Sequence, residues 1–238
     1  MFRTIVWFGY FWFYLIKIMP EYFKVNRFFK EGKIKERDML VDSVASKWAR
    51  DLLKLAGAKV KVIGADNVPP DRTVLFVSNH QGNFDIPILL GCVDKPKAFI
   101  AKVEMLKMPL ISTWMKQMNC VFLDRHDLRQ SLRIMNEATE YLKKGYSMVI
   151  FPEGTRSKGE TMGEFKAGSL RIAIKANVPI VPVTIKGSFK LMEQNGFVIK
   201  PAEVEVVISE PIETIGLTKD QANGLHEKVR SIIAGNAM

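Results

Sequence analysis

The chain has 238 residues, of which 47% are hydrophobic, so it can form one sizeable core and does not require a second globular domain. Its formal net charge of +10 favours anionic partners such as nucleic acid, phosphorylated metabolites or an acidic membrane surface. Cys92 and Cys120 are too few and too far apart for a disulfide framework or a zinc knuckle. Because no signal-peptidase-like site follows the apolar N-terminus, we expect a reducing, cytosol-facing location.

The N-terminus is the least globular part of the sequence. Residues 5–16 read IVWFGYFWFYLI, twelve residues without a charge and rich in aromatic side chains, which favour the membrane–water boundary. As a helix this run would extend about 18 Å, short of the roughly 30 Å hydrocarbon core of a bilayer. We predict that it dips into one leaflet. The alternative is a buried core helix, which normally carries a polar stripe or lies in mid-chain.

A basic stretch and a second helix follow. Between Lys17 and Arg37 there are seven basic residues and three glutamates, a balance that suits an anionic cytoplasmic leaflet. Five apolar residues then recur at helical spacing before Gly57, which can end the helix: Leu40, Val44, Trp48, Leu52 and Leu55. We therefore expect residues 1–57 to form a two-helix membrane-anchoring segment, which places the protein peripherally or monotopically on the cytoplasmic face.

From residue 58 onward, short apolar strands alternate with helices. This pattern predicts an α/β domain over residues 58–238, with a mostly parallel central sheet flanked by helices. Seven runs are typical of strands: residues 59–63, 73–80, 97–102, 120–125, 147–154, 179–185 and 204–208. The clearest helix is 127–144, whose expected apolar face comprises Leu128, Leu132, Met135 and Leu142. Thr218 and Gln221 form a capping-box pattern that begins a C-terminal surface helix.

Polar and charged residues follow these strands. In an open α/β sheet, ligands collect beyond the carboxyl ends of the parallel strands. Those ends supply, in chain order, Asn79 and His80, Lys102, Asp124 and Arg125, and residues 153–156. We therefore expect one histidine, several cations and a glycine turn to converge on one edge of the sheet.

His80 is followed five positions later by Asp85, with the turn-forming sequence QGN between them. A neutral imidazole can take a proton from an alcohol if a partner fixes its tautomer and stabilises the imidazolium. The turn can fold Asp85 back onto the ring, although in a continuous helix positions five apart point about 140° away from each other. Two plainer alternatives remain: Asp85 could cap a helix that starts near Ile86, and His80 could be a strand-end residue with satisfied hydrogen bonds.

A second element, FPEGTRS at residues 151–157, follows another apolar strand. Its turn offers backbone N–H groups, the Thr155 hydroxyl and the Arg156 guanidinium in one place, a combination that suits a phosphate group. Pro152 and Gly154 set the backbone of the turn. A plain loop is the alternative interpretation of this segment.

Together these elements resemble the glycerolipid acyltransferase family, specifically the 1-acyl-sn-glycerol-3-phosphate acyltransferases. The family's first motif, Asn-His, four residues and Asp, is matched by Asn79, His80 and Asp85. Its second ends in Asp-Arg or Arg-Arg after an apolar strand and is matched by VFLDR, which ends at Arg125. Its third is FPEGTRS, matched without a substitution, and its fourth is matched by VPIVPVTI at residues 178–185. The resemblance covers roughly residues 58–210.

This resemblance implies a one-step transfer of an acyl group to the 2-hydroxyl of lysophosphatidate, which gives phosphatidate. The donor would be a thioester of acyl carrier protein or coenzyme A, and His80, oriented by Asp85, would be the general base. The substrate would be held by residues that follow the strands: Lys102, Arg125, Glu153, Gly154, Thr155 and Arg156. Within that set the two arginines would bind the phosphate and Glu153 would position the glycerol, whereas Lys102 could be simply solvated.

Other chemistry is not indicated. The sequence has no Gly-x-Ser-x-Gly elbow, and Ser78 lies on a predicted strand, so we expect direct transfer without an acyl-enzyme. Cys92 and Cys120 have apolar neighbours and are interpreted as packing residues. Because no zinc motif, Gly-x-Gly-x-x-Gly or Walker loop is present, we expect no metal and no cofactor besides the thioester substrate.

Alternatives in two classes stay open. The same motifs serve acyltransferases that act on glycerol 3-phosphate, on lysophospholipids with head groups or on lyso-aminolipids, although Arg125 and Arg156 suit a dianionic phosphate. A catalytically silent scaffold is disfavoured by the intact His80 and Asp85, and a nucleic-acid binder by the lack of an RNA or DNA motif. The small size and the lack of further apolar segments resemble bacterial members of the family.

Overall fold

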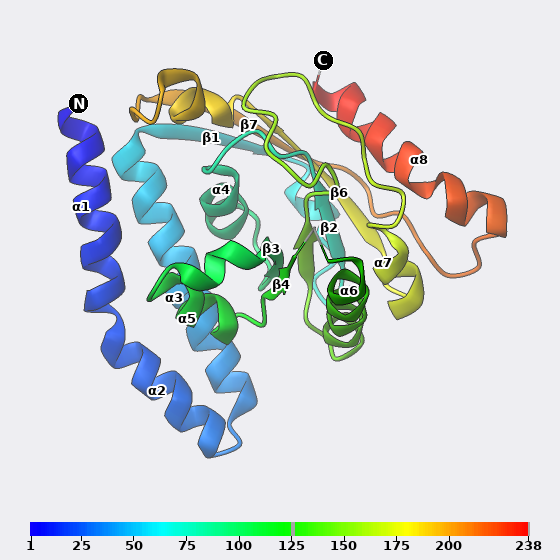
Figure 1. Cartoon of the computed structure of the whole chain (residues 1–238), viewed down its shortest axis with the longest axis horizontal. Coiled ribbons are helices and arrows are strands. Elements are labelled where there is room, and N and C mark those ends of the chain that lie inside the picture. Colours follow the sequence, from blue (N-terminus) through cyan, green and yellow to red (C-terminus); the bar gives the residue numbers. More distant parts are fainter. Residues whose placement is uncertain (125–126, 238) are drawn as a thin grey trace.

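The computed structural model describes residues 1–124 and 127–237, which form one seven-stranded sheet with helices around it (Figure 1). The strands are β1 Ala58–Ile63, β2 Leu75–Ser78, β3 Ala98–Lys102, β4 Val121–Leu123, β5 Met148–Ile150, β6 Ile180–Lys186 and β7 Ala202–Ile208. The helices are α1 Phe2–Lys17, α2 Met19–Lys30, α3 Ile34–Ala56, α4 Asp85–Cys92, α5 Ile111–Gln117, α6 Leu128–Lys143, α7 Arg171–Ala176 and α8 Lys219–Ala237. Short 3-10 segments are η1 Ala65–Asn67, η2 Val103–Lys107, η3 Ser188–Leu191 and η4 Glu193–Asn195.

The sheet is mostly parallel, as the alternation of strands and helices predicts. Its order is β1-β7-β6-β2-β5-β3-β4, and among these neighbours only β6 and β7 are antiparallel. All four residues of β2 are buried, which is typical of a parallel strand that is covered on both faces. Because β5 and β6 both run parallel to β2, the three strands end at the same edge of the sheet. This edge carries the candidate site.

The N-terminal segment contains three helices, whereas the sequence predicted two. The additional helix is α2, formed by the basic stretch, and it has Pro20 in its first turn, where the ring is compatible with a helix. The next helix, α3, ends as predicted, with Gly57 in the left-handed region at φ 75°. The predicted boundary between residues 57 and 58 falls between α3 and β1, and the membrane association of residues 1–57 stays a prediction.

One side of α1 packs on the rest of the chain and the other side is exposed. Trp7 is buried, and its Nε1 donates a hydrogen bond to the Leu52 carbonyl at 2.9 Å. Tyr14 and Leu15 join an apolar cluster with Val41 of α3. The exposed side of α1 and α2 carries large apolar residues: Phe2, Ile5, Val6, Phe8, Trp12, Phe13, Ile16, Phe23 and Phe29. Across residues 1–124 and 127–237, no helix has both the length and the apolar composition needed to cross a bilayer.

The buried face of α6 agrees only in part with the predicted one. Leu142 is buried as predicted and Met135 packs against the core, but Ile134 and Ala138 are buried as well and Leu132 is 61% exposed. The smaller Ala138 therefore faces the core, and the helix is rotated about its axis relative to the stripe of large apolar residues. At the C-terminus, the predicted capping box before α8 is confirmed by two hydrogen bonds between Thr218 and Gln221.

Candidate active site

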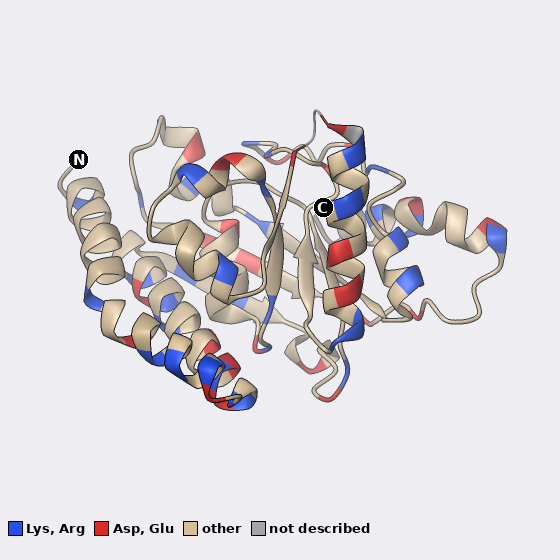
Figure 2. Ribbon diagram, turned by 60° about the horizontal axis from the view of Figure 1, so that its bottom comes forward, with Lys and Arg blue, Asp and Glu red and all other residues tan. Residues whose placement is uncertain are grey.

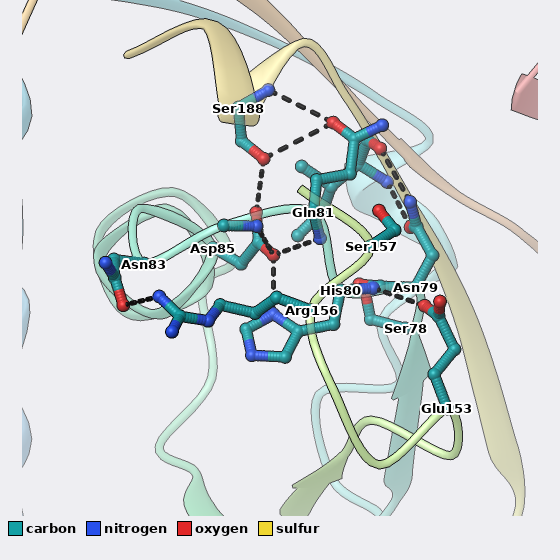
Figure 3. A network of polar contacts seen from close by, with 12 residues as sticks. Ser78, Asn79, His80, Gln81, Asn83, Asp85, Glu153, Arg156, Ser157 and Ser188 are labelled. Carbon is teal, nitrogen blue, oxygen red and sulfur yellow. Dashed lines mark hydrogen bonds and ion pairs between the residues drawn. The ribbon is translucent and has the colours of Figure 1, made fainter. Parts of the chain in front are cut away.

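The His80 loop and the loop of residues 151–157 lie side by side at the carboxyl ends of β2 and β5 (Figure 3). The backbone N–H of His80 donates to Glu153 Oε1 at 2.7 Å. In return, the Ser157 N–H donates to the His80 carbonyl at 2.7 Å and the Lys158 N–H donates to the Gln81 carbonyl at 3.1 Å. Two motifs that are 73 positions apart in sequence therefore form one continuous structure.

The imidazole of His80 contacts the carboxylate of Asp85, with Nδ1 2.7 Å from Oδ2. Asp85 is fully buried, and its Oδ2 also accepts hydrogen bonds from the backbone N–H groups of Gln81 at 2.7 Å and Gly82 at 2.9 Å. The turn thus folds the carboxylate back onto the ring. Because an ionised carboxylate only accepts hydrogen bonds, Nδ1 carries the proton and the lone pair lies on Nε2.

Asp85 does not cap the helix that it begins. No side chain caps α4, and the two backbone N–H groups that Asp85 binds belong to the preceding turn. The alternative interpretation of Asp85 as a helix cap is therefore wrong. The geometry is that of a turn built around one carboxylate oxygen, on which three N–H groups converge.

The ring of His80 is held on its face as well as at its edge. It stacks on Phe151 with ring centroids 4.0 Å apart and planes inclined by 18°, and its side chain is 16% exposed. Asn79, which precedes it, is buried and exchanges two hydrogen bonds of 2.8 Å with the backbone of Ile185 in β6. The base candidate is therefore fixed by a strand end, a stacked ring and a carboxylate.

Glu153 connects two loops through both of its carboxylate oxygens. It is 8% exposed; Oε1 accepts from the His80 N–H and Oε2 accepts from the Gly163 N–H at 2.7 Å. Burial raises the pKa of Glu153, and these two N–H groups act in the opposite direction. In this structure Glu153 therefore supports the His80 loop, and its contact with glycerol stays a prediction. Gly154 follows in the left-handed region at φ 74°, which favours glycine.

Arg156 extends from the loop of residues 151–157 to the turn before α4. Its Nη1 donates to Asn83 Oδ1 and lies 3.4 Å from Glu193 Oε1. The Glu193 side chain is only 6% exposed, and Oε1 also accepts from the Asn83 N–H at 2.7 Å. The neighbouring Thr155 is exposed. The guanidinium is therefore held at one edge by Asn83, a variable position of the first motif, and by Glu193, which lies outside the motifs.

Of the two other predicted phosphate contacts, Lys102 does not join this cluster. Lys102 lies at the end of β3, which β5 separates from β2, and its side chain is 51% exposed. Its Nζ is 2.5 Å from Glu104 Oε1, so this lysine forms an exposed ion pair, in agreement with the solvated alternative. Arg125 lies outside the described residues. The residues that the structure brings together are His80, Asp85, Glu153 and Arg156.

Ser188 is a site residue that the sequence reasoning missed. It begins η3 directly after β6 and is fully buried, and its Oγ donates a hydrogen bond to Asp85 Oδ1. Its position in the chain could have indicated it, because Ser188 is a polar residue that follows β6, and β6 ends at the same edge of the sheet as β2. Applying the strand-end rule to β6 would have found it.

Comparison with known proteins agrees with these features. Residues 59–186 match the family model described as Acyltransferase. The chain is 35% identical over 193 residues to a probable 1-acyl-sn-glycerol-3-phosphate acyltransferase of Mycoplasma pneumoniae, an alignment that covers 74% of this chain and 70% of the relative. It is 36% identical over 178 residues to the chloroplastic 1-acyl-sn-glycerol-3-phosphate acyltransferase LPAT1 of Arabidopsis thaliana, covering 74% and 48%.

A solved structure resembles the whole chain. The crystal structure of the 1-acyl-sn-glycerophosphate (LPA) acyltransferase PlsC from Thermotoga maritima superposes with a TM-score of 0.82 at 30% sequence identity. The match covers 99% of this chain and 95% of that one. The similarity therefore extends over the N-terminal helices as well as the sheet.

Proposed function

This chain belongs to the acyltransferase family, and on that premise we propose that it transfers a fatty acyl group from an acyl thioester to the 2-hydroxyl of 1-acyl-sn-glycerol 3-phosphate, giving phosphatidate. The observation that carries the proposal is the contact of 2.7 Å between His80 Nδ1 and Asp85 Oδ2, beside the loop that carries Arg156. This arrangement supplies a base near a guanidinium. A lysophosphatidate substrate requires both, the base for its 2-hydroxyl and the guanidinium for its phosphate.

In the proposed reaction His80 acts as the general base. Its Nε2 takes the proton of the 2-hydroxyl while the oxygen attacks the thioester carbonyl and forms the new C–O bond. Asp85 stabilises the imidazolium through the proton on Nδ1. The tetrahedral intermediate then loses the thiolate by cleavage of the C–S bond, and the imidazolium returns the proton to the leaving sulfur.

Arg156 is the proposed ligand of the acceptor phosphate. Its Nη1 faces Asn83 and Glu193, and no described residue forms a hydrogen bond with its Nε or Nη2. A guanidinium held at one edge presents the remaining N–H groups in a fixed direction, which suits a phosphate oxygen pair. The turn of Gly154 and Thr155, and Arg125, are proposed as further contacts, and Lys102 would join them only on leaving its ion pair with Glu104.

We also propose that no acyl-enzyme forms. Ser78 is fully buried and its Oγ donates to the Asn79 carbonyl at 2.9 Å. Burial raises the pKa of the Cys120 thiol to about 12 and also raises that of Cys92. These side chains are poorly suited to attack a thioester, which supports direct transfer from acyl carrier protein or coenzyme A without a further cofactor.

An acceptor competition assay tests the proposed function. The full chain in detergent micelles is given an acyl thioester and lysophosphatidate, glycerol 3-phosphate, a lysophospholipid with a head group or a lyso-aminolipid. We expect kcat/KM for lysophosphatidate to exceed the others by about tenfold or more, since the arginine favours a dianion and the acyl chain favours a lipid. A higher kcat/KM for another acceptor would be consistent with the family and would contradict lysophosphatidate as the preferred substrate. Parallel assays with the two thioesters identify the donor.

The N-terminal helices are proposed to hold the enzyme in the cytoplasmic leaflet. Both helices expose large apolar side chains, and in Figure 2 the ribbon of α1, next to the N-terminus, carries few charged residues whereas α2 carries several Lys and Arg residues. Lysophosphatidate resides in the bilayer and the acyl thioester is carried in water, so an enzyme at this boundary meets both. Aromatic and basic residues together are typical of such interfacial helices.

Vesicle flotation tests this placement. Replacing the exposed Ile5, Phe13 and Ile16 by serine is expected to weaken binding to vesicles with anionic lipid by about tenfold or more, since each loses apolar area that lipid would bury. The control replaces two equally exposed residues outside the N-terminal helices, Phe197 and Ile215, and should bind as the native chain does. Equal binding of both variants contradicts the proposal, as does labelling that places the N-terminus and residue 60 on opposite sides of the bilayer.

A further inference from the structure

The hydroxyl of Ser188 contacts the Asp85 oxygen that His80 does not use. Ser188 and Asp85 are 103 positions apart in sequence, and both are fully buried. The Oγ–H of Ser188 donates to Oδ1, while Oδ2 accepts from His80, Gln81 and Gly82 (Figure 3). From this division we propose that Ser188 is a positioning residue for the general base, an inference that rests on the acyl transfer proposed above.

The four donors of the Asp85 carboxylate have different origins. The three N–H groups on Oδ2 belong to the turn of residues 80–82, so they move with the loop that carries the base. Ser188 is the one donor to Oδ1 among the described residues, and it comes from the end of a different strand. Without it, Oδ1 would be a buried acceptor with no partner, which favours rotation of the carboxylate or entry of water. Either change moves Oδ2 away from its line with Nδ1.

Ser188 is itself held in place. Its N–H donates to Gln81 Oε1 at 3.2 Å, and its Oγ lies 3.3 Å from the same oxygen. The hydroxyl has one proton, and a carboxylate is a stronger acceptor than an amide, so the proton is directed to Asp85. Gly187 turns the chain at φ 86°, and a Cβ there would lie 2.7 Å from the Glu203 carbonyl oxygen. The central strand β6 thus delivers the hydroxyl to the carboxylate from a rigid position.

Kinetics of matched variants test the proposal. Ser188→Ala is expected to lower kcat for phosphatidate formation by about tenfold or more, with the acceptor KM within about twofold, since the base is misaligned and the phosphate contacts are kept. Ser188→Cys has a side chain of similar size with a weaker hydrogen-bond donor, so its kcat should lie between that of the native chain and that of Ser188→Ala. The control, Ser147→Ala, removes a buried hydroxyl that accepts from the Val74 N–H beside the amino end of β5, and should leave kcat unchanged.

A double mutant separates positioning from a general loss of structure. If Ser188 acts through Asp85 on His80, then Ser188→Ala should cause no further loss of kcat in a His80→Ala background. A loss that persists in that background overturns the proposal, because it would act on something other than the base. All variants are compared at matched folding by circular dichroism.

A spectroscopic measurement that needs no turnover completes the test. In protein labelled with 15N-histidine, the Nδ1–H proton of His80 should give a protected downfield signal, which is assigned by its absence in His80→Ala. We expect the signal to broaden or disappear in Ser188→Ala and Ser188→Cys and to persist in Ser147→Ala. A native chain that makes no phosphatidate would refute the proposed function, while this signal would still decide whether Ser188 fixes Asp85. An unchanged signal in both Ser188 variants overturns the inference.

Discussion

Replacing His80 by alanine is expected to lower the rate of phosphatidate formation by roughly a thousandfold or more, which combines a lost general base with lost positioning. The imidazole, held by Asp85 at Nδ1, is the proposed proton acceptor beside the loop that carries Arg156. The variant should remain folded. Asp85 would keep its hydrogen bonds from Gln81, Gly82 and Ser188, so no buried carboxylate oxygen loses every partner.

The measurement is phosphatidate formation from lysophosphatidate and an acyl thioester in detergent micelles, at matched folding by circular dichroism. The control is His226→Ala in α8, because the His226 side chain is 19% exposed, close to the 16% of His80, and its Nε2 lies 3.5 Å from Glu227 Oε1. The control should keep full activity. A folded His80→Ala variant that retains a tenth or more of the native rate would show that another group takes the proton.

The sheet could be predicted from the sequence because its strands are short apolar runs separated by turn residues. All seven predicted strands are present, and the order of helices and strands from β1 to α8 indicates a parallel sheet. Two helical details could not be predicted in the same way. The composition of the basic stretch is as typical of a solvated loop as of a helix, so the sequence did not predict α2, which lies between α1 and α3. In α6 the stripe of large residues and the buried stripe through Ala138 differ, and packing against neighbours decides between them.

The site shows a similar division between local and long-range information. The contact of His80 with Asp85 spans five positions, so turn chemistry allowed it, and the match to the family motifs favoured it over the plainer alternatives. Ser188 and Glu193 reach the site from the chain after β6, and their partners lie 103 and 110 positions earlier. Such pairs depend on the order of strands in the sheet, and the sequence does not state that β6 lies beside β2. The convergence of Lys102 was predicted from strand ends alone, whereas in the structure its Nζ pairs with Glu104 and its side chain is 51% exposed.

Replacing Asp85 by alanine should have an effect on activity close to that of His80→Ala, and it should also destabilise the fold. The change leaves the N–H groups of His80, Gln81 and Gly82 and the Ser188 hydroxyl without their shared acceptor. An unsatisfied buried polar group costs about 1–3 kcal/mol, so we expect the free energy of unfolding to fall by at least about 2 kcal/mol. With no carboxylate on Nδ1, the productive tautomer and orientation of His80 are also lost.

Asp85→Asn is the matched control, and the hydrogen bonds around the carboxylate predict how it should differ. Three donors converge on Oδ2, so the amide oxygen should take that position, and the amide NH₂ should then face Ser188 Oγ, which can accept. This arrangement keeps the fold and the proton on Nδ1 but removes the negative charge that stabilises the imidazolium. We therefore expect a loss in kcat of roughly a hundredfold, smaller than that of Asp85→Ala, with little change in urea denaturation. Equal losses in kcat for the two variants would show that charge, and not orientation, is the main contribution of Asp85. Native activity in Asp85→Asn would show that Asp85 only stabilises the turn of residues 80–82 and that its charge does not contribute to the reaction.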